Sequence, residues 1–131
     1  MELLYKELSY DVVGAAMSVH RELKWGFLEK VYQEAFAIEL KMRNIPFERE
    51  KNLELTYKGQ KLNSTYIADF VIDNKIIVEL KATDGITSSH ISQTLNYLNA
   101  TGLSLGIIIN FGTSSLQYER VINNKNDNPN S

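Results

Sequence analysis

The chain has 131 residues, of which 44% are hydrophobic and 23% charged, with two prolines and seven glycines. This composition is typical of one globular domain and excludes a disordered or fibrous chain. The absence of cysteine excludes a disulfide framework and a thiolate zinc site. No stretch approaches the roughly 18 apolar residues of a membrane helix, and the first ten residues lack the pattern of a signal peptide. We therefore expect a cytoplasmic protein with no membrane segment.

The net charge of −2 argues against a surface that binds nucleic acid by charge alone, because phosphate-binding surfaces are usually basic. The objection weakens if several acids share a metal site, since a bound divalent cation offsets their charge locally. Charge alone therefore decides neither for nor against a nucleic-acid partner.

Two helices are predicted in the first third of the chain. Residues 3–23 place apolar side chains at helical spacing, and residues 27–43 do so again after a break at residues 24–26. Trp25 and Phe27 at this junction would suit an aromatic platform for nucleobases. Aromatic residues at a helix junction are more often buried, so we expect them in the core.

A sheet is predicted to follow. Apolar and polar residues alternate over residues 53–57, and residues 58–60 form a turn into a short partner strand that ends at Leu62. Residues 66–72 and 76–82 are two strongly apolar runs separated by only three residues. They should pair as antiparallel central strands.

The second half of the chain is predicted to return to this sheet. A helix is expected over residues 89–100, ended by Gly102, and is followed by a buried strand over residues 103–111 and a last strand over residues 116–122. A right-handed crossover then places residues 103–111 parallel to residues 76–82.

The predicted architecture is therefore α/β, with two N-terminal helices, a mixed central sheet and one crossover helix. It forms a single domain over residues 1–122, and the polar residues 123–131 are expected to be a disordered tail. Ligands in such sheets favour strand ends and crossover junctions.

The most informative residues are charges inside the apolar run at 76–82. Glu79 and Lys81 are two residues apart, so their side chains project from the same face of the strand. Burying ionised groups costs several kcal/mol each unless they are paired or bound to something. This pair therefore requires an explanation.

The preceding strand supplies a third charge, Asp69. If residues 73–75 form a three-residue turn, Ile72 pairs with Ile76 and Asp69 lies opposite Glu79, with the two Cβ atoms about 5 Å apart. A two-residue turn would put the acids on opposite faces. The sequence thus predicts a register as well as a site.

Two carboxylates this close repel each other, and they usually share a proton or a metal ion. Oxygen ligands favour magnesium or manganese over zinc, and the backbone carbonyl of Leu80 is a further candidate ligand. With Lys81 beside them, the acids suit hydrolysis at phosphate, because a metal polarises the phosphoryl oxygen while an ammonium positions water or offsets charge. The alternative is an ordinary ion pair of Glu79 and Lys81 with Asp69 in solvent, since acid-x-Lys triplets are common.

Supporting residues are predicted on two helices. His90, Gln93 and Tyr97 share one face of the crossover helix and could line a cleft that contacts phosphate, with an ordinary polar surface as the alternative. Glu29 and Tyr32 share a face near the start of the second helix. Glu29 could point at the sheet, or it could be a solvated acid favoured by the helix dipole.

These residues carry a resemblance to a known family. Asp69 followed by Glu79-Leu80-Lys81 resembles the signature of the PD-(D/E)XK nuclease superfamily. Residues 26–32, in the spacing Gly-x-x-Glu-x-x-Tyr, resemble the GxxExxY proteins, a group placed in that superfamily. The resemblance continues through residues 66–70, 79–82, 90–93, 96–98, 100–102 and 110–112, and so covers nearly the whole chain except the polar tail.

The resemblance implies a restriction-endonuclease-like core and a nuclease that uses Mg²⁺ or Mn²⁺. We expect nucleic acid as its partner and DNA in preference to RNA, although the sequence does not decide between the two. The resemblance makes Asp69 and Glu79 the metal-binding acids and Lys81 the lysine of the motif. Ala68 stands where many members have proline before the first acid, a departure shared by many branches of the superfamily.

The resemblance also implies roles for the supporting residues. Glu29 matches an acid that approaches the metal in related exonuclease branches, and Gln93 and Tyr97 match their Gln-x-x-x-Tyr motif. We expect these three residues to assist catalysis, with His90, Gln93, Tyr97 and Tyr32 contacting substrate.

Two other functions remain compatible with the sequence. One is a nucleic-acid-binding or partner-binding module that keeps the nuclease fold without cleaving, favoured by the acidic net charge. The other is a purely structural role, in which Asp69 and Glu79 are ion-pair residues. The sequence does not determine the oligomeric state.

Overall fold

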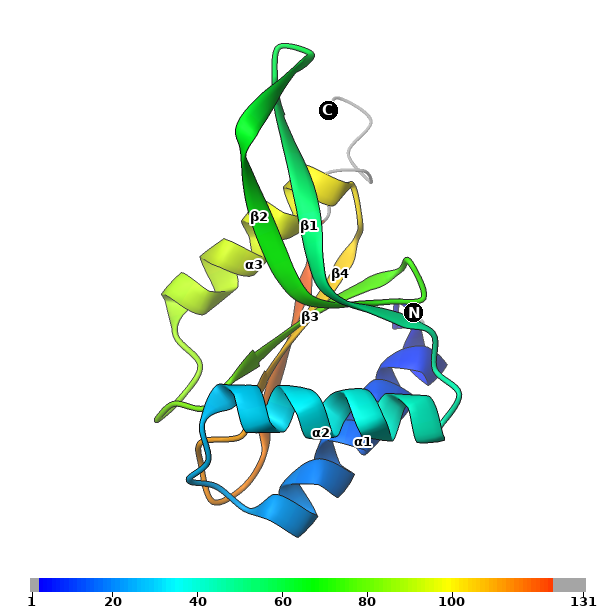
Figure 1. Ribbon diagram of the computed structural model, residues 1–131, viewed down its shortest axis with the longest axis vertical. Coiled ribbons are helices and arrows are strands. Elements are labelled where there is room, and N and C mark those ends of the chain that lie inside the picture. Colours follow the sequence, from blue (N-terminus) through cyan, green and yellow to red (C-terminus); the bar gives the residue numbers. More distant parts are fainter. Residues whose placement is uncertain (1–2, 124–131) are drawn as a thin grey trace.

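The computed structural model describes residues 3–123 (Figure 1). The elements in chain order are α1 (Lys6–Leu23), α2 (Glu29–Met42), β1 (Phe47–Tyr57), β2 (Gln60–Ile72), β3 (Ile76–Lys81), α3 (Ser88–Thr101), β4 (Leu105–Asn110) and β5 (Gln117–Ile122). This confirms the predicted α/β architecture. The tail predicted to be disordered lies, from residue 124 onward, outside the described residues. Within residues 3–123 no helix is long and apolar enough to cross a membrane.

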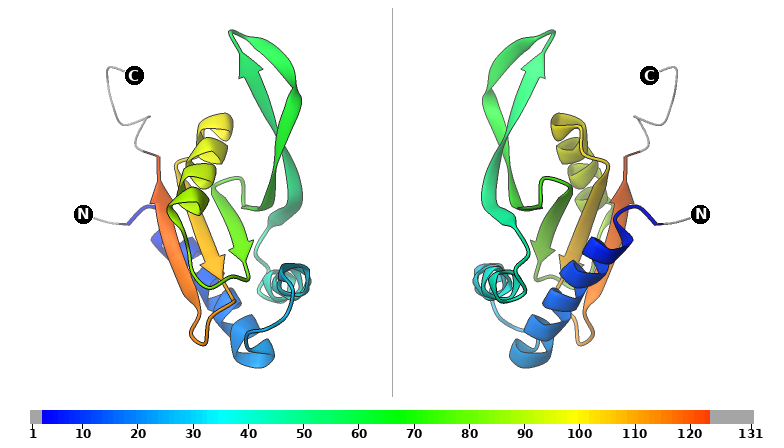
Figure 2. Two further views of the ribbon diagram at one scale, coloured as in Figure 1. Left: turned by 90° about the vertical axis from the view of Figure 1, so that its left-hand side faces the viewer. Right: turned by 90° about the vertical axis from the view of Figure 1, so that its right-hand side faces the viewer.

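The strands form one mixed sheet in the order β1-β2-β3-β4-β5. Neighbouring strands pair antiparallel, except β3 and β4, which are parallel as the crossover predicted. Helix α3 lies on one side of the sheet and α1 on the other (Figure 2). Both faces of β4 are therefore covered, and every one of its residues is buried, which accounts for its continuous apolar sequence.

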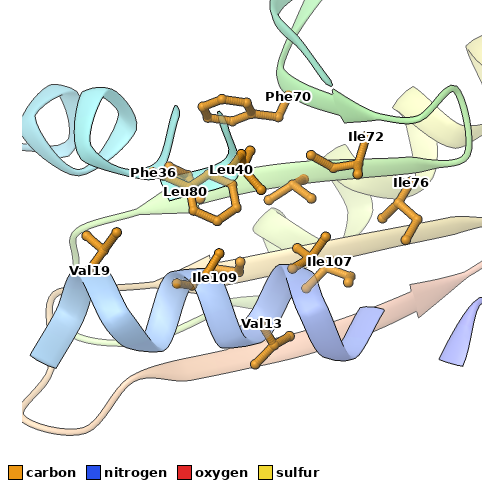
Figure 3. Packing of buried hydrophobic residues seen from close by; sticks show 14 of the residues in the cluster. Val13, Val19, Phe36, Leu40, Phe70, Ile72, Ile76, Leu80, Ile107 and Ile109 are labelled. Atoms are coloured by element: carbon orange, nitrogen blue, oxygen red, sulfur yellow. The ribbon is translucent and has the colours of Figure 1, made fainter. Parts of the chain in front are cut away.

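The larger hydrophobic cluster lies between the sheet and the helices α1 and α2 (Figure 3). The rings of Phe36 and Phe70 meet edge to face inside it, with their centroids 5.0 Å apart. Burying a side chain of this size contributes about 1.5–3 kcal/mol. The residues labelled in Figure 3 are Val13, Val19, Phe36, Leu40, Phe70, Ile72, Ile76, Leu80, Ile107 and Ile109.

The hairpin of β1 and β2 extends beyond the rest of the sheet (Figures 1 and 2). Two separate strands had been predicted where β2 runs without a break, and that prediction was wrong. Asn63, Ser64 and Thr65 are polar and exposed, so no core-facing alternation marks them as strand. They are strand because they belong to the hairpin, where Thr65 pairs with Glu54.

The turn between β2 and β3 has the predicted length. Asp73 and Asn74 have φ values of 51° and 55°, a left-handed conformation that Asp and Asn tolerate better than most residues. The amide of Lys75 donates to the carbonyl of Ile72 at 2.9 Å, and Ile72 pairs with Ile76. The predicted register of the two central strands is confirmed.

The connection after β3 is fixed by the buried side chain of Asn110. Its Oδ1 accepts hydrogen bonds from the amides of Thr83 (2.9 Å) and Gly112 (3.1 Å). Its Nδ2 donates to the carbonyl of Thr83 and to Oε1 of Gln117, each at 3.0 Å. A Cβ on Gly112 would overlap the backbone of Ala82 and Thr83, so only glycine allows this approach. The chain is thus held in place directly after Lys81.

Candidate active site

Asp69 on β2 and Glu79 on β3 lie where the two strands separate. The antiparallel pairing ends at Phe70 and Val78. Beyond this point each carboxylate bonds to the backbone of the other strand. Glu79 Oε2 accepts from the Asp69 amide at 2.7 Å, and Asp69 Oδ2 accepts from the Leu80 amide at 2.8 Å. The two acids therefore take the place of ladder hydrogen bonds and lie together.

The negative charge of Asp69 makes the carboxyl of Glu79 harder to ionise. Glu79 is only 4% exposed, and burial, followed by the charge of Asp69, raises the pKa of its carboxyl to about 8. Burial also raises the pKa of Asp69, while the amide of Leu80 and the charge of Lys81 lower it. At neutral pH this pair holds a proton, which a cation between the two acids would displace.

Lys81 follows Glu79 on the same face of β3, the face that α3 covers. Its backbone is fixed because its carbonyl accepts from the Phe111 amide at 2.8 Å. Within residues 3–123 its ammonium forms no ion pair. The alternative of an ordinary Glu79–Lys81 ion pair therefore does not match this geometry.

Two further acids act on the pair electrostatically. Glu29, the first residue of α2, has its pKa raised by partial desolvation and by the charge of Asp69, and lowered by Lys81. Glu50 on β1 lies across from Asp69, between paired positions on either side, and its charge raises the pKa of Asp69. The sequence reasoning missed Glu50, because the helix and strand patterns give an exposed acid in a hairpin no special signal.

Tyr97 is the residue of α3 that senses the charges of both acids. Burial, then the charges of Glu79 and Asp69, raise the pKa of its phenol to about 12, so the hydroxyl stays protonated and can donate a hydrogen bond. The ring lies 5.0 Å from that of Tyr66 on β2. After Glu50, Tyr66 is a second residue near the acids that the sequence analysis did not name as a site residue.

The other two predicted residues of α3 have different surroundings. His90 closes a capping box at the start of the helix: its Nδ1 accepts from the Thr87 amide at 3.1 Å, and Thr87 Oγ1 accepts from the His90 amide at 3.2 Å. Desolvation and the charge of Lys81 lower the pKa of the His90 imidazole. Gln93 is exposed, and its side chain has no hydrogen bond within the described part of the chain.

Tyr32 is fully buried and bonds to the backbone of the loop between α1 and α2. Its hydroxyl donates to the Lys24 carbonyl at 2.6 Å and accepts from the Phe27 amide at 3.3 Å. Its ring stacks on Phe111, with the centroids 4.6 Å apart. Gly26, with a φ of 113°, makes the turn that this arrangement requires. The burial of Tyr32 is at odds with the predicted substrate contact, and we assign the residue a structural role.

The expectation that Trp25 and Phe27 lie in the core was wrong. Both side chains are exposed, because Tyr32 occupies the interior of this junction. Glu29, two residues after Phe27 in the sequence, lies within electrostatic range of Asp69 and Lys81.

The donors at the strand ends suit a hard divalent cation. Asp69 and Glu79 each use one carboxylate oxygen for the backbone and keep the other. The carbonyl of Leu80 lies on the same side of β3 as its amide, and so faces β2. Among residues 3–123 no three His, Asp or Glu side chains are grouped closely enough to hold an ion by themselves. The two carboxylates and the Leu80 carbonyl are oxygen donors, the ligand type that Mg²⁺ and Mn²⁺ prefer.

A sequence model of the PD-(D/E)XK nuclease superfamily matches residues 6–121. The chain belongs to this superfamily. This membership agrees with the mixed sheet and three helices of the fold.

The crystal structure of a protein named SSO0001 has a similar fold, with a TM-score of 0.56 and 23% sequence identity over 90% of this chain. The superfamily member described here spans 57% of that chain. No curated protein matches the sequence.

Proposed function

We propose that this superfamily member is a divalent-metal-dependent nuclease that hydrolyses phosphodiester bonds. The observation that carries the proposal is the pair of carboxylates, Asp69 and Glu79, held together where β2 and β3 separate, with Lys81 beside them. A buried acid beside a half-buried one, together with an unpaired ammonium, is costly to fold unless these groups serve a ligand.

Asp69, Glu79 and the Leu80 carbonyl would hold Mg²⁺ or Mn²⁺. When bound, such a cation supplies charge neutralisation at the phosphate and makes nearby water more acidic. Lys81, which is free of an ion pair in the described chain, orients the attacking water and offsets the charge that develops on the phosphate.

The remaining residues assist from two helices. Glu29, whose carboxyl senses the charges of Asp69 and Lys81, contributes from α2 through its charge. Tyr97 donates a hydrogen bond from its neutral phenol, and Gln93 reaches the substrate from the exposed face of α3. His90 contributes mainly by fixing the start of α3 near Lys81.

We also place the chain in the GxxExxY group. The roles of the three motif residues support this. Gly26 makes the turn before α2, and the Tyr32 hydroxyl bonds to the backbone of the loop between α1 and α2. The carboxyl of Glu29 senses the charge of Asp69. We propose DNA as the preferred substrate, and cleavage assays should include RNA for comparison.

The test is cleavage of labelled oligonucleotides in Mg²⁺ and in Mn²⁺, with EDTA as the metal-free control. Asp69→Asn keeps an oxygen for the Leu80 amide and so should fold, and Lys81→Met keeps the length of the lysine. Each change should lower the rate at least about a hundredfold, because each removes charge stabilisation at the transition state.

Two matched variants control for the chemical change itself. Asp11→Asn and Lys41→Met make the same replacements at exposed positions and should cut like the wild type. Cleavage that continues in EDTA, or equal rates in all variants, would refute the proposal. Saturable binding of nucleic acid without any cleavage would instead identify a binding module that has kept the fold.

A further inference from the structure

The loop between α1 and α2 presents three large apolar side chains to solvent. Trp25 is 55% exposed, Phe27 47% and Leu28 79%. Together with Gly26 they form what we call the aromatic loop, residues 25–28. Exposed apolar residues gathered in one segment commonly mark a binding surface.

The backbone of the aromatic loop is fixed from the protein interior. The buried hydroxyl of Tyr32 bonds to the Lys24 carbonyl and the Phe27 amide, and the Phe27 ring lies edge-on to the Tyr32 ring at 6.0 Å. The Val31 amide donates to the Leu28 carbonyl at 3.0 Å. Trp25 itself has no ring contact or hydrogen bond within residues 3–123. The backbone of the loop is thus held by hydrogen bonds, and it carries a half-exposed indole ring that stacks on no other aromatic ring within residues 3–123.

The aromatic loop adjoins the candidate active site. Glu29 follows it directly, and the Glu29 carboxyl is within electrostatic range of Asp69 and Lys81. Helix α2 contacts β3, and Figures 1 and 2 show α2 beginning near the end of β3. The loop is therefore continuous with the surface that a substrate would occupy.

The chemistry of the loop suits a nucleic-acid strand. An aromatic ring can stack on any base, since every base has a π-face. The loop is flanked by two exposed lysines, Lys24 and Lys30, which form no ion pair within the described residues and can meet phosphates. In a duplex the bases already stack on each other and must be unstacked at a cost of a few kcal/mol, so an indole ring stacks more readily on a base of an unpaired strand.

We propose that Trp25 in the aromatic loop stacks on an unpaired base of the substrate, so that the enzyme acts on single-stranded nucleic acid or on a single-stranded end. This inference rests on the proposed nuclease function, because the base must belong to the strand that reaches Asp69 and Glu79. Phe27 anchors the loop, and Lys24 and Lys30 contact the backbone of the same strand.

Trp25 is the only tryptophan in the chain, so its fluorescence reports on this residue alone. The wild-type protein is titrated in calcium buffer with oligothymidylate and with a blunt duplex of equal length. Binding is followed in parallel by the anisotropy of the labelled oligonucleotide. We expect saturable quenching by the single strand and at least about tenfold weaker binding of the duplex.

Three variants sharpen the test. Trp25→Ala should weaken binding of the single strand about tenfold or more, and Trp25→Phe should restore most of it, because phenylalanine keeps a π-face. Tyr10→Ala removes an aromatic side chain that is 79% exposed on α1 and should bind like the wild type.

The outcomes separate this inference from the proposed function. Quenching by the single strand without cleavage in either Mg²⁺ or Mn²⁺ would support the stacking site and refute the nuclease. Cleavage without quenching, or unchanged binding in Trp25→Ala, would refute the stacking site alone. Equal quenching by the duplex would also refute it. So would dimers in sedimentation that Trp25→Ala abolishes, because a second copy would then cover the loop.

Discussion

The replacement Glu79→Gln should make the metal-free protein more stable at neutral and basic pH. In the folded protein the pKa of Glu79 is raised from 4.5 to about 8, so folding favours the protonated carboxyl. This stabilisation is fully present below the unfolded pKa of 4.5 and is lost as the pH rises through 8. At pH 7 the loss amounts to about 3 kcal/mol, since each pKa unit corresponds to about 1.4 kcal/mol.

Glutamine avoids this loss because it carries no titrating proton, and its amide oxygen can still accept from the Asp69 amide. Urea unfolding in EDTA at pH 4.5, 7 and 8.5 measures the effect. The variant and the wild type should have similar free energies of unfolding at pH 4.5, and the variant should be more stable by about 3 kcal/mol at pH 7 and by about 4 to 5 kcal/mol at pH 8.5. Glu54→Gln, at an exposed ion pair with Lys61, should show no such pH dependence. A variant that is less stable than the wild type at pH 8.5 would refute the reasoning.

Two further predictions concern the segments that frame the site. Tyr32→Phe leaves the Lys24 carbonyl and the Phe27 amide without their partner, which should lower the free energy of unfolding by about 1–3 kcal/mol; unchanged thermal unfolding would contradict this. Gly112→Ala should push the connection after β3 away from β4, speeding hydrogen exchange at the Thr83 amide and lowering stability by about 1–3 kcal/mol. Gly85→Ala, whose added carbon would meet nothing closer than 3.9 Å, is the matched control, and equal exchange in both variants would rule out the steric argument.

The register of β2 and β3 could be predicted because its determinants are local. Three polar residues between two apolar runs fix the turn, and the turn fixes which residues face each other. The parallel pairing of β3 and β4 followed from the handedness of the crossover. The meeting of Asp69 and Glu79 depends on this register. The hydrogen bonds that each makes to the other strand could not be foreseen, because they arise where the ladder stops.

Other features depend on contacts between distant segments. The exposure of Trp25 follows from the burial of Tyr32, which stacks on Phe111 from the other half of the chain. Glu50 approaches Asp69 only because β1 pairs with β2 along its whole length. Asn110 did leave a signal, since it is a polar residue within an otherwise apolar strand. Its four hydrogen bonds nevertheless required the folded loop to be seen.

Because β2 and β3 separate at the site, Asp69, Glu79 and Lys81 differ in how freely they can change during evolution. Removing the carboxylate of Asp69 or Glu79 leaves a backbone amide without an acceptor, at a cost of about 1–3 kcal/mol. Lys81 makes no such hydrogen bond with its side chain within the described residues. In a lineage no longer selected for cleavage, Lys81 would therefore be free to change, whereas positions 69 and 79 would keep a side chain with an acceptor oxygen, as a carboxylate or as its amide. A relative with Asn or Gln at these two positions and no lysine would be the signature of a fold kept without cleavage.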